Sequence, residues 1–344
     1  MDVDLAAAVA EASDSRVKEL RAANDRLQRK LDAERDRTEQ IQSAVYRALS
    51  DAIAGLDIPP VPPPPKDKRT KAEETAVLLL SDWQLGKATP SYSSDICAER
   101  IELLQQKAAR IVAVQRADHP VKRIALMLLG DMIEGELIFP GQAYQIDSSL
   151  FRQVAVDGPK ILGGMVRWAA ANFEKVDVFA VPGNHGHLGG RAWKEMHPES
   201  NGDRMLYQIS YQLTENLPNV TWSIAKDWWQ VADLGEKCRF LLLHGDQVRG
   251  WAGIPWYGWT KKILAWGSLS KIWSDMDFDH VLAGHFHTPT NMYVNGPRVW
   301  INASTESHNP YALEQLAAAG EPAQYLFFVK PGQGVTAEHL VNLS

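Results

Sequence analysis

Five short apolar runs, each ending in a cluster of polar residues, constrain the fold of this chain more than any other feature. The runs span residues 76–80, 124–129, 176–181, 240–243 and 280–283, and residues 298–302 and 324–329 add two further runs of this kind. Each has the length of a β-strand and is bounded by turn-forming residues. Helical periodicity appears between several of them, at residues 98–117 and 158–173. Strands that alternate with helices and end in polar residues predict an α/β fold with a site along one sheet edge.

The polar clusters that follow these runs are rich in side chains that bind metal ions. They supply two carboxylates, two amides and three imidazoles: Asp82, Gln84, Asp131, Asn184, His244, His285 and His287. Such a mixed set is typical of a site for Mn, Fe or Zn and differs from a structural zinc site, whose ligands are mainly thiolates. A single histidine at a strand end is usually a structural residue, but five such clusters in order are hard to explain as coincidence.

In this order the clusters resemble the motifs of the calcineurin-like metallophosphoesterases: D-x-H, GDxxD, GNH followed by an acid, a histidine, and GHxH. The matching segments are residues 82–84, 130–134, 183–186, 244–245 and 284–287. The resemblance covers about residues 75–305 and, as an ordered set, is highly specific. It implies an α/β fold, a four-layer α/β/β/α sandwich, with a metal site at the strand ends.

The resemblance also implies how two divalent cations would be bound. One cation would be held by Asp82, Gln84, Asp131 and His287. Asp131 would bridge to the second cation, which would be completed by Asn184, His244 and His285. Two cations about 3.5–4 Å apart clamp a phosphate, supply a hydroxide nucleophile and stabilise the charge of an in-line displacement. We expect Mn²⁺, with Fe, Zn or Mg as alternatives.

Three positions depart from the family pattern. Gln84 replaces a histidine and offers a neutral amide oxygen, which is a weaker ligand. Glu134 replaces the second aspartate of GDxxD, which orients the catalytic histidine. Its extra methylene still allows it to reach His185, the expected general acid for the leaving oxygen. Gly186 replaces an acid and removes charge near the site, so low activity, altered metal preference and a binding-only site all stay open.

The N-terminal part of the chain has a different pattern. The pattern of residues 14–50 predicts one long helix. Its heptad a and d positions hold Val17, Leu20, Asn24, Leu27, Leu31, Thr38, Ile41 and Val45, and Glu34 is a charged residue at a d position. Leucines at d with one asparagine at a suit a parallel dimer, whereas a solvated or folded-back helix is the alternative. We expect a helical, coiled-coil arm over 1–56, a stiff proline-rich linker over 57–71 and the metallophosphoesterase domain over 72–344.

Composition limits the possible partners. Lys plus Arg number 36 and Asp plus Glu 42, a formal charge of −6, which gives no support to a broadly basic, non-specific nucleic-acid binder. Bound cations would nevertheless bring positive charge to a nuclease site. The two cysteines, Cys97 and Cys238, are expected to be buried thiols. The start lacks a signal peptide and no apolar run is long enough to span a membrane, so we expect a cytoplasmic protein with no membrane partner.

Candidate substrate contacts lie in two loops. Arg191 and Lys194 follow the GNH motif, where they would clamp a phosphate oxygen or simply be solvated. Trp251, Trp256 and Tyr257 lie between two ligand motifs, where they would form a rim on which bases stack or a dimer contact.

Two further expectations concern helices in the domain. Trp259, Trp266 and Trp273 are spaced by seven and should form one buried helix face. Asp203 should cap the helix that runs to Leu213.

The motifs indicate a reaction class and leave the phosphoester open. We favour a phosphodiesterase that acts on DNA or RNA, because residues 82–86 resemble the SbcD-type nuclease branch and an aromatic loop lies between two ligand motifs. Cyclic-nucleotide phosphodiesterase, nucleotide phosphatase and protein phosphatase are alternatives; the last normally has an arginine where Gly135 stands. An oligomeric scaffold with a degenerate site is the alternative outside enzymes.

Overall fold

The computed structural model describes residues 16–30, 32–33, 36, 43, 47, 59–189, 197, 199–249, 254–270, 272–294, 296–306 and 320–344. The chain divides into two units, Met1–Leu56 and Asp57–Ser344. Residues 16–30 of the first unit are helical, which confirms the N-terminal helix. Its apolar heptad positions face solvent, since Val17, Leu20 and Leu27 are 41%, 64% and 66% exposed. The dimer and the boundaries at residues 56 and 71 stay predictions.

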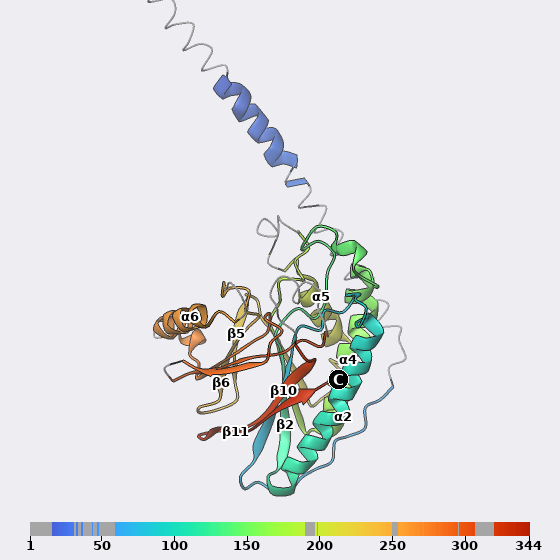
Figure 1. Ribbon diagram of the computed structural model, residues 1–344, viewed down its shortest axis with the longest axis vertical. Helices are drawn as coiled ribbons and strands as arrows, with labels where there is room; N and C mark the ends of the chain where they lie inside the picture. The colour runs from blue at the N-terminus through green and yellow to red at the C-terminus, as the bar shows by residue number, and fades with distance from the viewer. Residues whose placement is uncertain are drawn as a thin grey trace, which may run out of the picture. The chain divides into compact units, whose positions relative to one another are not determined.

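The described strands of the second unit form two sheets (Figure 1). The six-stranded sheet has the order β11-β10-β1-β2-β3-β4, with β1 Glu74–Leu80, β2 Val121–Leu128, β3 Lys175–Ala180, β4 Val220–Ile224, β10 Ala323–Lys330 and β11 Gly334–Asn342. The five-stranded sheet has the order β5-β6-β7-β9-β8, with β5 Trp229–Asp233, β6 Arg239–Leu243, β7 His280–Ala283, β8 Thr290–Tyr293 and β9 Arg298–Ile301. Strands β1 to β4 are parallel, and so are β6, β7 and β9.

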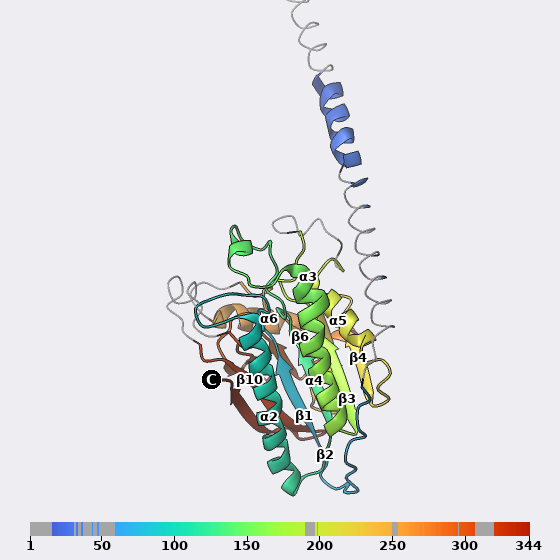
Figure 2. The ribbon, with the colours of Figure 1, turned by 90° about the vertical axis from the view of Figure 1, so that its right-hand side faces the viewer.

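Helices cover the outer faces of both sheets. Figure 2 shows α2 and α4 side by side across the six-stranded sheet. The longer helices are α2 Ser94–Asp118, α4 Gly158–Asn172, α5 Gly202–Gln212 and α6 Trp256–Leu269; the short ones are η1 Gln142–Tyr144, α3 Leu150–Arg152, η2 Gln153–Asp157 and η4 Ser274–Met276. Together with the two sheets they confirm the expected four-layer α/β/β/α sandwich.

Two apolar clusters hold these layers together. The sheets pack on each other through Met127, Phe240, Trp300 and Phe327, and the Trp300 and Phe327 rings stack with centroids 5.2 Å apart. Helix α6 packs on the five-stranded sheet through Trp259, Ile263 and Trp266. Burial of a large apolar side chain contributes about 1.5–3 kcal/mol, so these clusters fix the sandwich and the strand ends that it carries.

The predicted core is wrong at one tryptophan. Trp259 and Trp266 are buried as expected, but Trp273 is 54% exposed. The reason is that α6 ends at Leu269, so the sevenfold spacing no longer corresponds to a helix face at Trp273. Cys97 and Cys238 are free and buried, as expected. Among the described helices, none combines the length and apolar character needed to cross a membrane.

Candidate active site

The seven expected metal ligands lie in loops that follow the carboxyl ends of five strands. Asp82 and Gln84 follow β1, Asp131 follows β2, Asn184 follows β3, His244 follows β6, and His285 and His287 follow β7. Because β1, β2 and β3 are parallel neighbours in one sheet and β6 and β7 in the other, these ends meet at one edge of the sandwich.

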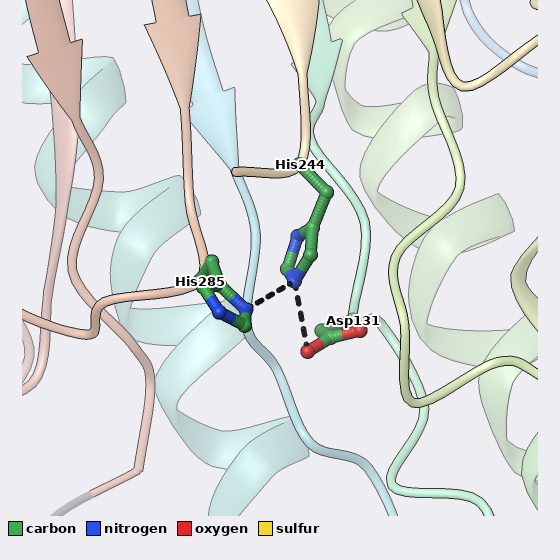
Figure 3. A group of neighbouring side chains, drawn as sticks. All are labelled: Asp131, His244 and His285. Atoms are coloured by element: carbon green, nitrogen blue, oxygen red, sulfur yellow. Dashed lines mark hydrogen bonds and ion pairs between the residues drawn. The ribbon is translucent and has the colours of Figure 1, made fainter. Parts of the chain in front are cut away.

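Three of these side chains form a compact centre from three different strands (Figure 3). The ligand atoms of Asp131, His244 and His285 all lie within 4.8 Å of one another. His244 Nε2 lies 3.0 Å from Asp131 Oδ2 and 3.2 Å from His285 Nδ1. His244 Nδ1 lies 2.8 Å from the carbonyl oxygen of Leu129, which can only accept, so Nδ1 carries a proton and Nε2 is the nitrogen that would bind a cation.

The remaining ligands adjoin this centre. Gln84 Nε2 donates to Asp131 Oδ2 at 3.3 Å, and His287 Nε2 lies 3.3 Å from Asp82 Oδ1. His287 Nδ1 faces Glu306 Oε2 at 3.8 Å, and Glu306 is buried and paired with a lysine. A carboxylate behind a ligating histidine holds the ring in position, and Glu306 lies on the side of His287 from which it would do so.

Two buried amide oxygens show that these residues fit metal ions. Gln84 Oε1 and Asn184 Oδ1 have no hydrogen-bond partner in the structure. Leaving a buried polar atom unsatisfied costs about 1–3 kcal/mol. Both oxygens belong to expected ligands, and cations held at this edge would satisfy them. Carboxylate, amide and imidazole donors together suit a divalent ion such as Mn²⁺, Fe²⁺ or Zn²⁺.

Backbone strain is concentrated at the same residues. Seven described non-glycine residues have positive φ, and five of these are expected ligands: Asp82 (53°), Gln84 (48°), Asp131 (53°), His285 (73°) and His287 (55°). The left-handed conformation costs such residues about 1–3 kcal/mol each and persists only where the surroundings impose it. Its clustering here marks the edge as a functional site.

Two motif glycines allow the loops to approach each other. A Cβ atom on Gly183 would lie 2.2 Å from Asp131 Oδ1, and one on Gly284 would lie 2.4 Å from Asp82 Oδ2. No side chain fits at these distances. The glycines of the GNH and GHxH motifs are therefore required by the close packing of neighbouring ligand loops.

His185 lies beside the ligands in a fixed orientation. Its Nδ1 atom is 3.0 Å from the carbonyl oxygen of Glu134 and 3.3 Å from the Glu134 carboxylate, while Nε2 faces Asp131 Oδ2 at 3.9 Å. Gln142 in turn donates to the Glu134 carboxylate at 2.9 Å. Glu134 thus reaches His185 despite its extra methylene, and the ring points its second nitrogen toward the site.

The charges of the site shift the pKa values of its histidines in the metal-free protein. Burial lowers the pKa of His185, but the charges of Asp131 and Glu134 outweigh burial and raise this pKa to about 9. For His244, burial is likewise outweighed by Asp131, and the pKa rises to about 10. Burial lowers the pKa of His285 to about 3. A cation must therefore displace a proton from His244, whereas His285 is already neutral.

Asp203 was not recognised as part of this site from the sequence, and its expected role as a helix cap is wrong. Asn201 caps α5, since its side chain accepts from the backbone N–H groups of Asp203 and Arg204. The fully buried Asp203 carboxylate instead accepts hydrogen bonds from backbone N–H groups at Asp131 and Gly183. No local sequence pattern signals a contact between residues 72 positions apart.

The expected substrate contacts are only partly described. Arg191, Lys194 and Trp251 lie outside the described residues. Trp256 and Tyr257 form the first turn of α6 and are 56% and 80% exposed. The next turn connects them to the site, because the Trp259 ring packs edge-on against Phe286 with centroids 6.2 Å apart. Phe286 stands between His285 and His287 in the chain.

Comparison with known proteins places the domain in a family. The family model described as calcineurin-like phosphoesterase matches residues 75–327. One similar solved structure is a conserved predicted phosphoesterase from Streptococcus pneumoniae, with 12% identity, a TM-score of 0.32 and coverage of 78% of this chain and 98% of that chain. A second is Vps29 complexed with zinc from Entamoeba histolytica, with 11% identity, a TM-score of 0.34 and coverage of 78% of this chain and 99% of that chain. A third is an archaeal phosphodiesterase, with 12% identity, a TM-score of 0.33 and coverage of 77% of this chain and 99% of that chain. No curated protein matches the chain. Because the family model extends from β1 into β10, the chain belongs to the calcineurin-like phosphoesterase family and is a hydrolase that acts on phosphoester bonds.

Proposed function

We propose that this chain is a phosphodiesterase that depends on two divalent cations, preferably Mn²⁺, and that its substrate is nucleic acid. The observation that carries the metal-dependent part is the convergence of seven ligand side chains at one sheet edge, two of them with unsatisfied buried oxygens. Strained backbone at five of the seven supports the same conclusion, since strain of this kind is retained where function requires it.

The ligands divide between two cation positions that share Asp131. One position uses Asp82, Gln84 and His287, and the other uses Asn184, His244 and His285. Asp131 Oδ2 contacts both groups, since it lies 3.3 Å from Gln84 Nε2 and 3.0 Å from His244 Nε2. When bound, the cations supply charge that stabilises the transferring phosphoryl group and activates the attacking water.

His185 would give a proton to the leaving oxygen. Glu134 holds the Nδ1 side of the ring through its carbonyl and its carboxylate, which leaves Nε2 directed at the site. The buried carboxylate also stabilises the protonated imidazolium, the form that a general acid needs. Such a donor typically contributes about 10²–10⁴ in rate.

The first turn of α6 supports a polymeric substrate. Trp256 and Tyr257 expose flat aromatic surface on the same helix as Trp259, whose ring packs against Phe286 in the His285–His287 loop. Lys261, one turn after Tyr257 on the same helix face, is also exposed and adds positive charge. Exposed aromatic rings next to a cation are what a single strand of nucleic acid uses for stacking and phosphate contact.

A parallel hydrolysis assay tests the proposal. Purified protein with Mn²⁺ is given single-stranded DNA, duplex DNA, a cyclic nucleotide and an aryl phosphodiester, each also with His185→Ala. We expect cleavage of the polymers that falls sharply in the variant. Turnover of only the cyclic or aryl substrates would reject nucleic acid as the substrate and leave the phosphodiesterase intact. If no substrate is turned over, the scaffold alternative replaces the enzyme.

A second experiment tests the aromatic contact itself. Trp256→Ala and Tyr257→Ala should each raise KM for single-stranded DNA by roughly 5-fold to 100-fold, because one stacked base contributes about 1–3 kcal/mol. Turnover of the aryl diester should not change. Tyr293→Ala is the matched control, since Tyr293 is 74% exposed on β8 and pairs with Arg298 at the start of β9, away from the ligand loops. Equal effects in all three variants would contradict the contact.

We also propose that the N-terminal helix forms a parallel homodimer. Its exposed Leu20 and Leu27 have no other described partner, and Asn24 at an a position would set the register. Arg16 and Arg21 occupy flanking g and e positions that would face each other across the dimer. Dimerisation should therefore strengthen with salt, which screens like charges, and sedimentation at low and high ionic strength measures this. A monomer at both salt concentrations would contradict it.

A further inference from the structure

The loops that follow β2 and β3 are joined by one carboxylate that is not itself a predicted ligand. Asp203 Oδ2 accepts from the backbone N–H groups of Asp131 at 2.9 Å and Gly183 at 2.8 Å. Asp203 Oδ1 accepts from those of Met132 at 3.0 Å and Ile133 at 3.3 Å. Both oxygens are thus fully used by main-chain donors of two neighbouring loops, and the side chain is 0% exposed.

These hydrogen bonds hold the residues on which the metal centre depends. Asp131 is the ligand shared by both cation positions, and its backbone is in the strained left-handed conformation with φ 53°. Gly183 directly precedes the ligand Asn184. Without the Asp203 carboxylate, four backbone donors in these loops would lose their partner, at about 1–3 kcal/mol for each that stays buried and unpaired.

The family pattern places an acid at the position of Gly186, and the structure shows why this chain has none there. A Cβ atom on Gly186 would lie 2.4 Å from Asn201 Oδ1. The amide of Gly202 also donates to the Gly186 carbonyl at 2.7 Å. The start of α5 therefore fills the space beside the GNH motif and brings its own carboxylate, Asp203, to the loops.

We infer that Asp203 is a positioning residue of the metal centre. It sets the spacing between the loop of Asp131 and the loop of Asn184, and thereby the geometry in which two cations bind. The inference rests on the proposed metal site, but it is independent of which phosphoester the enzyme cleaves. It also assigns a function to a carboxylate that neither binds a cation nor faces the substrate.

The test compares Asp203→Asn with a matched variant elsewhere. The amide keeps the size of the side chain but replaces one acceptor oxygen with an NH₂ group, which must then face two backbone N–H groups. Asp177→Asn is the control, because Asp177 is also buried, is paired with Arg123, and lies on β3, the strand that leads to Asn184. Both variants should lower the stability of the metal-free protein.

Metal binding distinguishes the two variants. Calorimetric titration with Mn²⁺ should show about 10–100-fold weaker binding in Asp203→Asn, the range found when a partner behind the ligands is lost, and unchanged binding in Asp177→Asn. The visible absorption of bound Co²⁺ should change in Asp203→Asn and stay the same in Asp177→Asn. Because that variant risks poor folding, Asp203→Glu, which keeps the charge and both acceptors, is measured alongside, and it should show a smaller change of the same kind.

The Mn²⁺ titrations separate failure of the proposed function from failure of the positioning role of Asp203. If wild-type protein binds no divalent metal, the proposed function fails before the inference is reached. If wild type binds Mn²⁺ and both Asp203 variants bind it equally well, the positioning role is overturned and the proposed function stands. Equal losses of affinity in Asp203→Asn and Asp177→Asn would also overturn it, because the effect would then come from general destabilisation.

Discussion

The two cation positions proposed for the candidate centre differ in the donors that they offer. The two-histidine half consists of Asn184, His244 and His285, whereas the one-histidine half consists of Asp82, Gln84 and His287; both share Asp131. His244 is 0% exposed and its ring is fixed by the Leu129 carbonyl. In the one-histidine half, an amide occupies the place of an imidazole and the His287 side chain is 26% exposed.

The proposed centre is therefore prepared unequally for its two cations. The ligand atoms of Asp131, His244 and His285 already lie within 4.8 Å of one another, and two imidazoles with a carboxylate form a strong set for a transition metal. The other half has a single imidazole beside its carboxylates, and Gln84 offers a neutral oxygen where the family motif has a second imidazole. We therefore expect stepwise loading, with the first cation in the two-histidine half and a weaker second one beside Gln84.

The largest effect should come from His244→Ala. This substitution removes a ligand from the stronger half and takes away the imidazole that lies 3.0 Å from Oδ2 of the buried Asp131 carboxylate. Both metal affinity and turnover should fall, the latter by more than the roughly 10²–10⁴-fold that a general acid contributes. Titration with Mn²⁺ and an activity assay measure the two losses. Retention of one tightly bound cation would reverse the ranking of the two halves.

His185→Ala separates proton transfer from metal binding. His185 is expected to donate a proton and holds no cation, so kcat should fall about 10²–10⁴-fold. The affinity for Mn²⁺ should stay within a factor of a few, because Glu134 and the ligands are untouched. The effect should shrink for an aryl diester with an acidic leaving group, which needs no proton. An equal loss on every leaving group would indicate that His185 acts in another way.

Gln84→Ala and Gln84→His test the weaker half. The alanine variant should raise the Mn²⁺ concentration needed for half-maximal activity by about 10-fold, the low end of the range for a lost supporting contact. The histidine variant should lower it, because an imidazole replaces an amide oxygen. The first, tighter binding step should be unchanged in both. A change in the tight step would show that Gln84 serves both halves equally.

The fold and the positions of the candidate ligands at one sheet edge could be predicted because their signals are local. Apolar runs such as 76–80 and 124–129 became β1 and β2, since buried parallel strands need continuous apolar residues. Polar residues directly after such strands then had to meet at one edge. Strands β5 and β11 gave no comparable run, because Trp229–Asp233 and Gly334–Asn342 lie at sheet edges and mix polar with apolar residues.

The contacts behind the ligands could not be predicted because they join distant parts of the chain. Asp203 looked like a helix cap in sequence, yet its partners include Asp131, 72 residues away. Glu306 faces His287 from the loop after β9, which carries no motif. Trp273 had the right spacing for a buried face, but the end of α6 lay four residues earlier and no strong stop signal marks it.

The last effect concerns the stability of the metal-free protein as pH changes. The pKa values of His185 and His244 are raised to about 9 and about 10 from an ordinary 6.5. The folded protein therefore retains these protons more strongly than the unfolded chain does. Their contribution to stability is fully present below pH 6.5 and is lost as pH rises through about 9 to 10. His285, with its pKa lowered to about 3, stays neutral throughout this window.

Urea unfolding at pH 6.5, 7.5 and 8.5 with a chelator present measures this dependence. The free energy of unfolding should fall as pH rises, by up to about 1.4 kcal/mol per pH unit for each retained proton. With saturating Mn²⁺ the trend should reverse, because cation binding requires a neutral His244 and becomes stronger as protons leave. His244→Gln should remove about half of the slope in the metal-free protein, because His185 keeps its own raised pKa, whereas Gln84→Ala should keep all of it. An unchanged slope in His244→Gln would place the titrating groups outside the two-histidine half and weaken the distinction between the halves.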